Sequence, residues 1–498
     1  MRINNIDNRI TYKGALDSAL TQAMRCCDMN EMVNAVGLDV GAMVVPRAYY
    51  DTKHRNEFAG FETFFREISG TFINCLAAGI IAIGISNVAS KYFMNSVKIN
   101  PDSWYTDSSL AVLDRAWQKS GNTKDYVITV LDNLEGLDGY KNNKFKNIDW
   151  NSVEWADEAK WTKYNWKNSE YKNIQNRIKS KEDIINVLTK VINDKTINSK
   201  DKSQILDILN LRITNALGAE RNAKLNIDDK TLNSRVEYIL RDMVDAGRDI
   251  FKNGKNAQKI IEKIIKINKF KSAGAISGAC LLGLTNQFIN RKITEKRTGK
   301  KGFVGNPNYV ADGNSQNKKD KYLWVKKILA STVMLGLVFS TMKVKNFKQF
   351  AKKLEFSGPV TSGNAIKTVY GANITGRFLA ADDGDELRES MTRDYLGFLN
   401  WLVFGGFAAK GVGNLLDRKG QNLFNYTKKG KGLKHWLNEM SLKTHNEIAA
   451  KGSEFAKKNM WKLNVAHIAG IAYSAISLGL LLPMLNAYVT NKKYKKEV

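Results

Sequence analysis

The sequence predicts a mainly α-helical, multi-pass integral membrane protein with about five hydrophobic helices, an internal duplication and an inserted helical soluble region. Three observations predict this fold class. The apolar residues gather in a few blocks without charge, while lysine and asparagine fill the segments between them. Only five prolines occur in 498 residues, so long uninterrupted helices can form almost everywhere. Finally, two pairs of segments resemble each other at constant offsets along the chain.

The formal net charge of +28 suggests an anionic partner, either nucleic acid or a membrane surface. Nucleic acid is disfavoured, because lysine is spread over every region and no basic stripe interleaved with aromatic residues stands out. The segment 1–20 has no apolar core followed by a cleavage site, so we expect no cleavable signal peptide. We therefore expect an integral protein of a plasma or inner membrane that contacts the lipid bilayer, and anionic lipids in particular.

Three apolar blocks are long enough to cross a bilayer, because a hydrocarbon layer of roughly 30 Å needs about twenty helical residues. They lie at 68–90, 272–290 and 463–491. Two shorter blocks, 328–342 and 395–409, hold about fifteen uncharged residues each and reach roughly 22 Å as helix. Lys326 and Lys327 before block 328–342 and Lys343 after it would let this short block span by placing their charges at the two interfaces. The alternative for the shorter blocks is a pair of buried core helices.

The long polar region between the first two blocks is expected to fold in water. Its first half holds several tryptophans, which we interpret as a small aromatic core rather than a ligand cage. Its second half has apolar residues at helical spacing over 181–193, 201–218 and 229–251. A last helix over 256–271, with isoleucines against lysines, is expected to run straight into the second block along an anionic lipid surface.

These observations give an expected order of segments. The order is an N-terminal amphipathic helical region at 1–67, membrane helix 1 at 68–93, an inserted soluble region at 94–270, membrane helix 2 at 271–292, an irregular basic loop at 293–324, membrane helix 3 at 325–345, a loop and amphipathic helix at 346–394, membrane helix 4 at 395–417, a basic helical connection at 418–462, membrane helix 5 at 463–491 and a basic tail at 492–498. The inserted region 94–270 is the expected surface for a protein partner.

The chain resembles itself at two offsets. At an offset of 327 residues, ETFFREISG (62–70) aligns with ESMTRDYLG (389–397), and both segments lead into a charge-free block. At an offset of 200 residues, 275–296 aligns with 475–496. We interpret the pairs as one duplicated membrane unit whose first copy carries the larger insert; the alternative is coincidence between ordinary membrane edges. If block 328–342 spans, the copies are inverted, as in many secondary transporters, and otherwise they are parallel.

The segments 62–70 and 389–397, here called the lead-in segments, carry the residues that we expect to define the membrane edge. Glutamate and arginine four positions apart lie along one helix face, which favours structural ion pairs. These pairs are Glu62 with Arg66 and Glu389 with Arg393. Glycines suited to close helix packing are Gly70, Gly274, Gly278 and Gly397, of which the middle two form a GxxxG pair.

No constellation in the sequence predicts catalysis, a metal or a cofactor. The four cysteines, Cys26, Cys27, Cys75 and Cys280, fit neither a disulfide framework nor zinc spacing, and the four histidines have no metal spacing. The acidic run 382–386 is interpreted as a helix N-cap rather than a calcium loop. Polar groups inside apolar blocks are functional candidates by default, and here they are His467, Asn286 and Asn486.

The function favoured by these observations is non-enzymatic scaffolding, docking or membrane organisation, because a sizeable polar insert exists and catalytic residues do not show. The alternative is a transporter or channel built on the duplicated unit. It predicts that block 328–342 spans and that His467, Asn286 or Asn486 lines a cavity. A membrane-bound enzyme is the second alternative, and no small-molecule substrate is indicated.

Overall fold

The computed structural model shows a mainly helical chain, as predicted. The chain divides into two compact units. Unit 1 comprises Met1–Met29, Ala89–Asn268 and Lys410–His467, and unit 2 comprises Asn30–Val88, Lys269–Ala409 and Ile468–Val498. The structure describes residues 20–21, 23–25, 31–93, 105–137, 143–153, 166–168, 171, 174–218, 222–305, 320–342, 344–356, 362–400, 404–426, 430–451 and 453–494.

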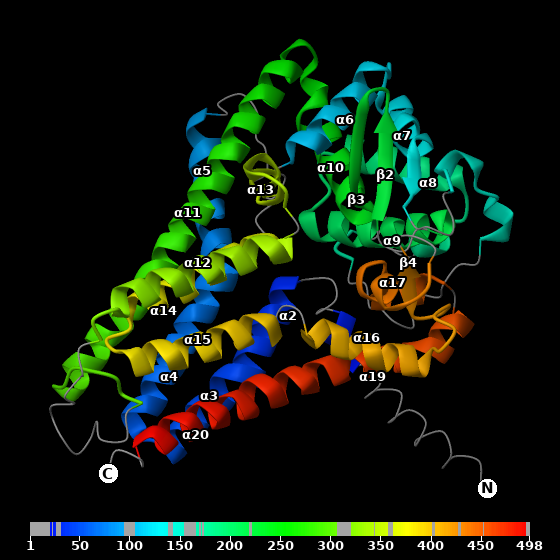
Figure 1. The fold of residues 1–498 in the computed structure, drawn as a ribbon. Coiled ribbons are helices and arrows are strands. Elements are labelled where there is room, and N and C mark those ends of the chain that lie inside the picture. The colour runs from blue at the N-terminus through cyan, green and yellow to red at the C-terminus, as the bar shows by residue number, and fades with distance from the viewer. Residues whose placement is uncertain are drawn as a thin grey trace, which may run out of the picture. The chain divides into compact units, whose positions relative to one another are not determined.

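Unit 1 contains a three-stranded antiparallel sheet in the order β1-β2-β3, against which α6, α9 and α10 pack (Figure 1). Its core includes Leu110, Leu188 and Leu240, all fully buried. The elements around this sheet are α6 (Asp107–Gln118), α7 (Thr123–Asp132), β1 (Leu134–Gly136), η3 (Phe145–Asn147), η4 (Trp150–Ser152), η7 (Ile174–Asn176), α8 (Lys181–Asn193), α9 (Ser199–Leu217), β2 (Asn222–Ile227), β3 (Lys230–Arg235), α10 (Val236–Asp249) and η8 (Phe251–Asn256).

The single helix expected over 229–251 is wrong at its start, where the chain forms strand β3 before α10 begins. Leu225 of β2 faces Leu232 of β3, and Ile227 faces Lys230 across a two-residue turn. Asp228 has a φ of 52°, the left-handed conformation that tight hairpin turns require. Asp228 and Asp229 resemble a helix start in the sequence, but they form the hairpin turn between β2 and β3.

The third segment of unit 1 has a smaller core of its own, which includes Leu423, Phe424 and Leu463. Strands β4 and β5 pair antiparallel in it. Its elements are β4 (Phe424–Tyr426), α17 (Leu433–Asn438), β5 (Met440–Leu442) and α18 (His445–Ala450). The cysteines Cys26 and Cys27 fall outside the described residues.

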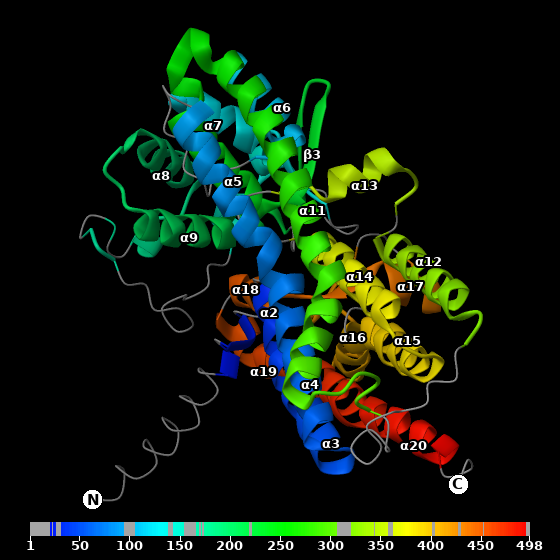
Figure 2. The ribbon, with the colours of Figure 1, turned by 90° about the vertical axis from the view of Figure 1, so that its left-hand side faces the viewer.

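Unit 2 is a helical bundle in which α15 lies between α14 and α20, as Figures 1 and 2 show. Its elements are α2 (Glu31–Leu38), η1 (Asp39–Val44), α3 (Val45–His54), α4 (Glu57–Thr71), η2 (Phe72–Ala77), α12 (Leu323–Met342), α13 (Phe347–Lys353), α14 (Gly363–Ala380), α15 (Gly384–Leu399), η10 (Ala475–Leu481) and α20 (Leu482–Tyr494). The boundaries between the units fall within α5 (Ala78–Phe93), α11 (Ala257–Thr298), α16 (Gly405–Leu416) and α19 (Ser453–Ser474).

Among the described residues, three helices are long and apolar enough to cross a membrane. They are Glu57–Phe93, Leu323–Met342 and Glu454–Lys492. The first and third are continuous through the π-helical segments η2 and η10, and the second contains the block 328–342 whose spanning the sequence leaves open. These helices are compatible with a membrane protein, as predicted, but the block 272–290 is not among them.

Helix α11 joins the basic helix expected over 256–271 to the second apolar block without a break, and it is 42 residues long. Helices α5 and α11 lie side by side (Figure 2). A Cβ atom at Gly274 would lie 3.2 Å from Ile85, and one at Gly278 would lie 3.1 Å from Ile81. The GxxxG pair therefore sits where α11 approaches α5 closely, which is the use expected of small residues between helices.

Candidate functional site

The two lead-in segments lie in α4 and α15, and both helices begin at side-chain caps. Asn56 accepts a hydrogen bond from the backbone N–H of Ala59 at 2.7 Å, and Asp383 accepts from Asp385 and Glu386 at 2.9 and 2.8 Å. The N-cap interpretation of the acidic run 382–386 is confirmed. Such caps satisfy backbone donors at the first turn and so position each segment relative to the start of its helix.

The arginines of the two lead-in segments make matching contacts. Arg66 Nε lies 3.4 Å from Glu67, and its Nη2 donates to Thr63 Oγ1 at 3.2 Å. Arg393 Nε lies 3.1 Å from Asp394, and its Nη2 donates to Ser390 Oγ at 3.2 Å. In each lead-in segment the guanidinium binds the acid one position later and the hydroxyl three positions earlier.

The expected pairing of Glu62 with Arg66 and of Glu389 with Arg393 is not the one that these described residues make. Glu62 instead accepts a hydrogen bond from Gln287 at 3.3 Å. Glu389 binds both terminal nitrogens of Arg55, at 3.0 and 3.2 Å, and also accepts a hydrogen bond from Thr490. All four residues are largely shielded from solvent. The two glutamates take partners from outside their own helices, and the two arginines bind the acid next to them in their own helix.

Arg377 of α14 connects the two lead-in segments. Its Nη1 donates to Asp394 at 3.0 Å, and its Nη2 lies 3.4 Å from Glu67. Arg47 of α3 approaches Glu67 at 3.5 Å from another side. Burial by itself raises the pKa of Asp394, but Arg393 and Arg377 together hold that pKa below its usual value. Asp394 is therefore an ionised partner for two arginines in the interior of unit 2.

Asp39, at the start of η1, is a second kind of buried carboxyl group. Thr71 of α4 donates a hydrogen bond to it. Burial raises the pKa of Asp39 to about 7, against the opposing effect of that hydrogen bond. Glu67 raises this pKa further, whereas Arg47 and Arg377 lower it. Asp39 thus borders the same network but can exchange a proton near neutral pH.

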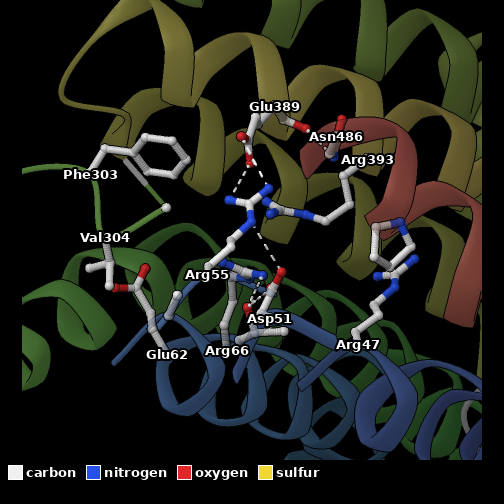
Figure 3. Close-up of a pocket in the computed structure, with 14 residues that line it drawn as sticks. Arg47, Asp51, Arg55, Glu62, Arg66, Phe303, Val304, Glu389, Arg393 and Asn486 are labelled. Carbon is white, nitrogen blue, oxygen red and sulfur yellow. Dashed lines mark hydrogen bonds and ion pairs between the residues drawn. The ribbon is translucent and has the colours of Figure 1, made fainter. Parts of the chain in front are cut away.

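A pocket with a volume of about 40 Å³ lies in unit 2 between α3, α4, α15 and α20 (Figure 3). Arg55 reaches across it, with Asp51 on one side at 3.3 Å and Glu389 on the other (Figure 3). The pocket is lined by Arg47, Asp51, Arg55, Ala59, Glu62, Thr63, Arg66, Phe303, Val304, Gly305, Glu389, Arg393, Pro483 and Asn486. All four predicted lead-in residues line it, although the sequence predicts no pocket there.

The predicted intramembrane polar candidates are divided between the two units. Asn486 lines the pocket and donates to the backbone oxygen of Glu389 at 3.3 Å. Asn286 is buried beside Gln287 in α11, and its Nδ2 has no hydrogen-bond partner among the described residues. His467 belongs to unit 1, where its ring lies 5.4 Å from that of His445.

The lead-in glycines also border the charged network. A Cβ atom at Gly70 would lie 3.0 Å from Arg377 and 3.1 Å from Asn373. Any larger residue at this position would therefore push against these two side chains. A Cβ atom at Gly397 would lie 3.6 Å from the Tyr370 hydroxyl, an ordinary contact distance. Gly70 is therefore the tighter of the two positions.

Sequence reasoning missed Arg47, Arg55 and Arg377. Two of them carry a usable signal, because Arg47 follows the uncharged run GAMVVP and Arg377 interrupts the uncharged run TVYGANITG. An isolated arginine in such a run needs a buried partner, since an unpaired charge is costly away from water.

Among the described residues, no three histidine, cysteine, aspartate or glutamate side chains are placed to hold a metal ion. No protein-family model, curated protein or solved structure matches this chain. The site is therefore interpreted from its own geometry.

Proposed function

We propose that unit 2 is a membrane-embedded transporter or channel module, the alternative that the sequence leaves open, and that its pocket receives a solute. The main support for this proposal is a charged pocket that both lead-in segments line. Tightly packed helices serving only for docking have no need for four arginines around a cavity, because each buried charge costs free energy unless it is paired. A solute pocket gives these charges a use.

Two features that the transporter alternative predicts from the sequence support the proposal. Leu323–Met342 is long and apolar enough to span, and Asn486 lines the pocket. The pocket also lies against α4 and α20, which belong to the candidate spans Glu57–Phe93 and Glu454–Lys492. Ligand sites of membrane transporters are commonly formed where such helices meet.

The proposal includes the finer architecture, namely a multi-pass chain of about five membrane helices and two inverted copies of one unit. The matching contacts of Arg66 and Arg393 support the duplication, because each binds an acid at the next position and a hydroxyl three positions before. Inverted copies place corresponding residues on opposite sides of a shared centre. The pocket, lined by both arginines, would be that centre.

Sided labelling of the pocket tests the proposal without knowledge of the solute. Ala59 lines the pocket, is 5% exposed and tolerates cysteine in size. In a background with the native cysteines replaced, Ala59→Cys should react with a membrane-impermeant maleimide in right-side-out and in inside-out vesicles. Alternating access requires the same residue to be reached from both sides in turn.

The matched control is Lys348→Cys on α13, an exposed position outside the pocket, which should react from one side only. If Ala59→Cys reacts from one side only, like the control, alternating access is ruled out and a docking role is favoured. The comparison is internal, because both variants share one background and one vesicle preparation.

A further inference from the structure

The arginines of the pocket have hydrogen-bonding capacity that the protein itself does not use. Arg47 is 3% exposed; its Nε donates to the backbone oxygen of Leu478 at 2.8 Å. Its Nη1 faces Glu67 at 3.5 Å, and its Nη2 is buried without a hydrogen-bond partner among the described residues. A buried donor without an acceptor costs about 1–3 kcal/mol, more for a charged group, so this nitrogen indicates a missing acceptor.

Arg66 and Arg393 also keep one nitrogen without a partner in the described part of the chain, although in neither is that nitrogen fully buried. Each uses Nε and Nη2 for the contacts within its own lead-in segment. No described residue accepts a hydrogen bond from the Nη1 atom of either arginine, and both side chains line the pocket. Arg66 of α4 and Arg393 of α15 therefore have unused donors at the pocket, which Arg47 of α3 also lines.

The carboxylates around the pocket do not fill this need, because each has other partners. Asp51 accepts from Thr63 at 2.6 Å and faces Arg55, while Glu389 is held by both terminal nitrogens of Arg55. Glu62 accepts from Gln287. The lining itself holds four arginines and three carboxylates. Glu67 and Asp394, outside the lining, each face lining arginines from one side only. The charges of Arg66 and Arg393 also repel each other.

The size of the pocket limits what can supply the missing acceptors. A volume of about 40 Å³ holds a few water molecules, given that one water needs roughly 10–15 Å³ on this measure. That space suits a single small oxyanion and excludes a bulky organic ligand. A phosphate group has several acceptor oxygens, and the planar fork of arginine matches phosphate better than a lysine ammonium does.

We infer that the pocket binds a phosphate group through Arg47, Arg66 and Arg393. The inference names the ligand chemistry of the proposed transporter or channel and rests on that function for access to the pocket. Free inorganic phosphate and the phosphate of a lipid headgroup share this chemistry. The test therefore has one arm for each source.

The first arm measures binding of radiolabelled inorganic phosphate to the full-length protein in detergent at constant ionic strength. Wild-type protein should bind it saturably, and sulfate should displace it, whereas chloride and acetate should not. The second arm compares thermal unfolding of the protein in phosphatidylcholine vesicles with and without phosphatidic acid. A higher midpoint with phosphatidic acid would assign the phosphate group to lipid.

Arg393→Lys keeps the positive charge and removes the fork of the guanidinium. It should weaken binding roughly ten- to a hundredfold in whichever arm is positive, because a hydrogen bond to a charged group is at stake. Arg66→Lys should act likewise and serves where the first variant does not fold. The matched control is Arg388→Lys on the same helix, whose side chain lies outside the pocket lining and should leave binding unchanged.

The inference is overturned if neither arm shows saturable binding or a raised midpoint. It is equally overturned if both lysine variants bind as tightly as wild type, or if chloride and acetate displace phosphate as well as sulfate does. Phosphate binding together with one-sided labelling of Ala59→Cys would keep this inference and remove the proposed function. Two-sided labelling without phosphate binding would do the reverse.

Discussion

Arg377 is the residue on which the buried charges of unit 2 depend most. It is 2% exposed and binds Asp394 at 3.0 Å while facing Glu67 at 3.4 Å. Taking a guanidinium out of water costs several kcal/mol, which is recovered only with well-placed partners. Removing one partner of a buried ion pair typically lowers the stability of the fold by about 3–5 kcal/mol. Because its two acids lie on α4 and α15, Arg377 fixes these two helices relative to each other.

A residue in unit 1 gives a pH-dependence that can be measured. Burial raises the pKa of Asp249 to about 6, and Asp245 adds to the increase. The unfolded value is about 3.9, so the folded protein binds this proton more tightly. The stabilisation linked to Asp249 is therefore fully present below about pH 4 and is lost as the pH rises through about 6.

Asp249→Asn should remove that dependence. At a pH of about 7.5 the variant should be more stable than wild type by about 2 kcal/mol, allowing for partial solvent screening, and at about pH 4 the two should be equal. Denaturant unfolding followed by tryptophan fluorescence reports on the correct unit, because Trp117, Trp150 and Trp166 pack against the core of unit 1. The exposed Glu182→Gln serves as control, and parallel pH profiles for wild type and Asp249→Asn would contradict the prediction.

At the scale of the elements, α14 and α11 approach each other closely through glycine. A Cβ atom at Gly376 would lie 2.5 Å from the carbonyl oxygen of Leu284 and 2.7 Å from its Cα atom. Both are backbone atoms, so no side-chain rotation can make room. Gly283, on the α11 side, similarly faces the backbone of Asn373. Two glycines therefore set the distance between the helix that carries Arg377 and α11.

Gly376→Ala should lower the stability of unit 2 by about 1–3 kcal/mol, the usual cost of overpacking, because α14 and α11 must separate. The control is Gly336→Ala in α12, where a Cβ atom would have no neighbour within 4 Å. Alanine is the better helix former, so the control should match or exceed wild type. Thermal unfolding of both variants in the same detergent measures the difference; equal midpoints would contradict close α14–α11 packing.

The sequence predicts helices well where the helical spacing of apolar residues extends over a long segment. It predicts poorly where the pattern of a short segment fits both a helix and a strand. The continuous α11 follows from its pattern, whereas Lys230–Arg235 has a pattern that fits either a helix start or a hairpin strand. Part of the candidate site could be predicted from the sequence. Glu62, Arg66, Glu389 and Arg393 stand out through their repetition, but the partners of the two glutamates lie outside their own helices. Spacing along one helix cannot reveal that Arg55 binds Glu389 or that Arg377 links Asp394 and Glu67.

At the scale of the whole chain, unit 1 combines segments that the sequence treats as separate. The third segment, Lys410–His467, belongs with Ala89–Asn268, and the N-terminal segment joins them through Arg25, which binds Asp207 at 3.0 Å. Apolar faces show that a segment must pack against something, but they do not name the partner. Each unit thus consists of three separate stretches of chain. Composition alone does not show which stretches belong together.

The topology of unit 2 depends on α12. Only 22% of its most apolar window is buried, and large apolar side chains such as Trp324, Leu329 and Val333 are exposed. A helix that is apolar on its exposed side is suited to lipid rather than water. If α12 crosses the membrane, the segments before and after it lie on opposite sides, as the inverted arrangement requires.

Lys301→Cys and Lys348→Cys, both exposed positions, should then react with an impermeant maleimide from opposite sides of sealed vesicles. Lys345→Cys should react from the same side as Lys348→Cys, because both follow α12 without another candidate span between them. Reaction of Lys301→Cys and Lys348→Cys from one side would place α12 along the interface. The two proposed copies would then be parallel, and the proposed duplication would give alternating access no structural basis.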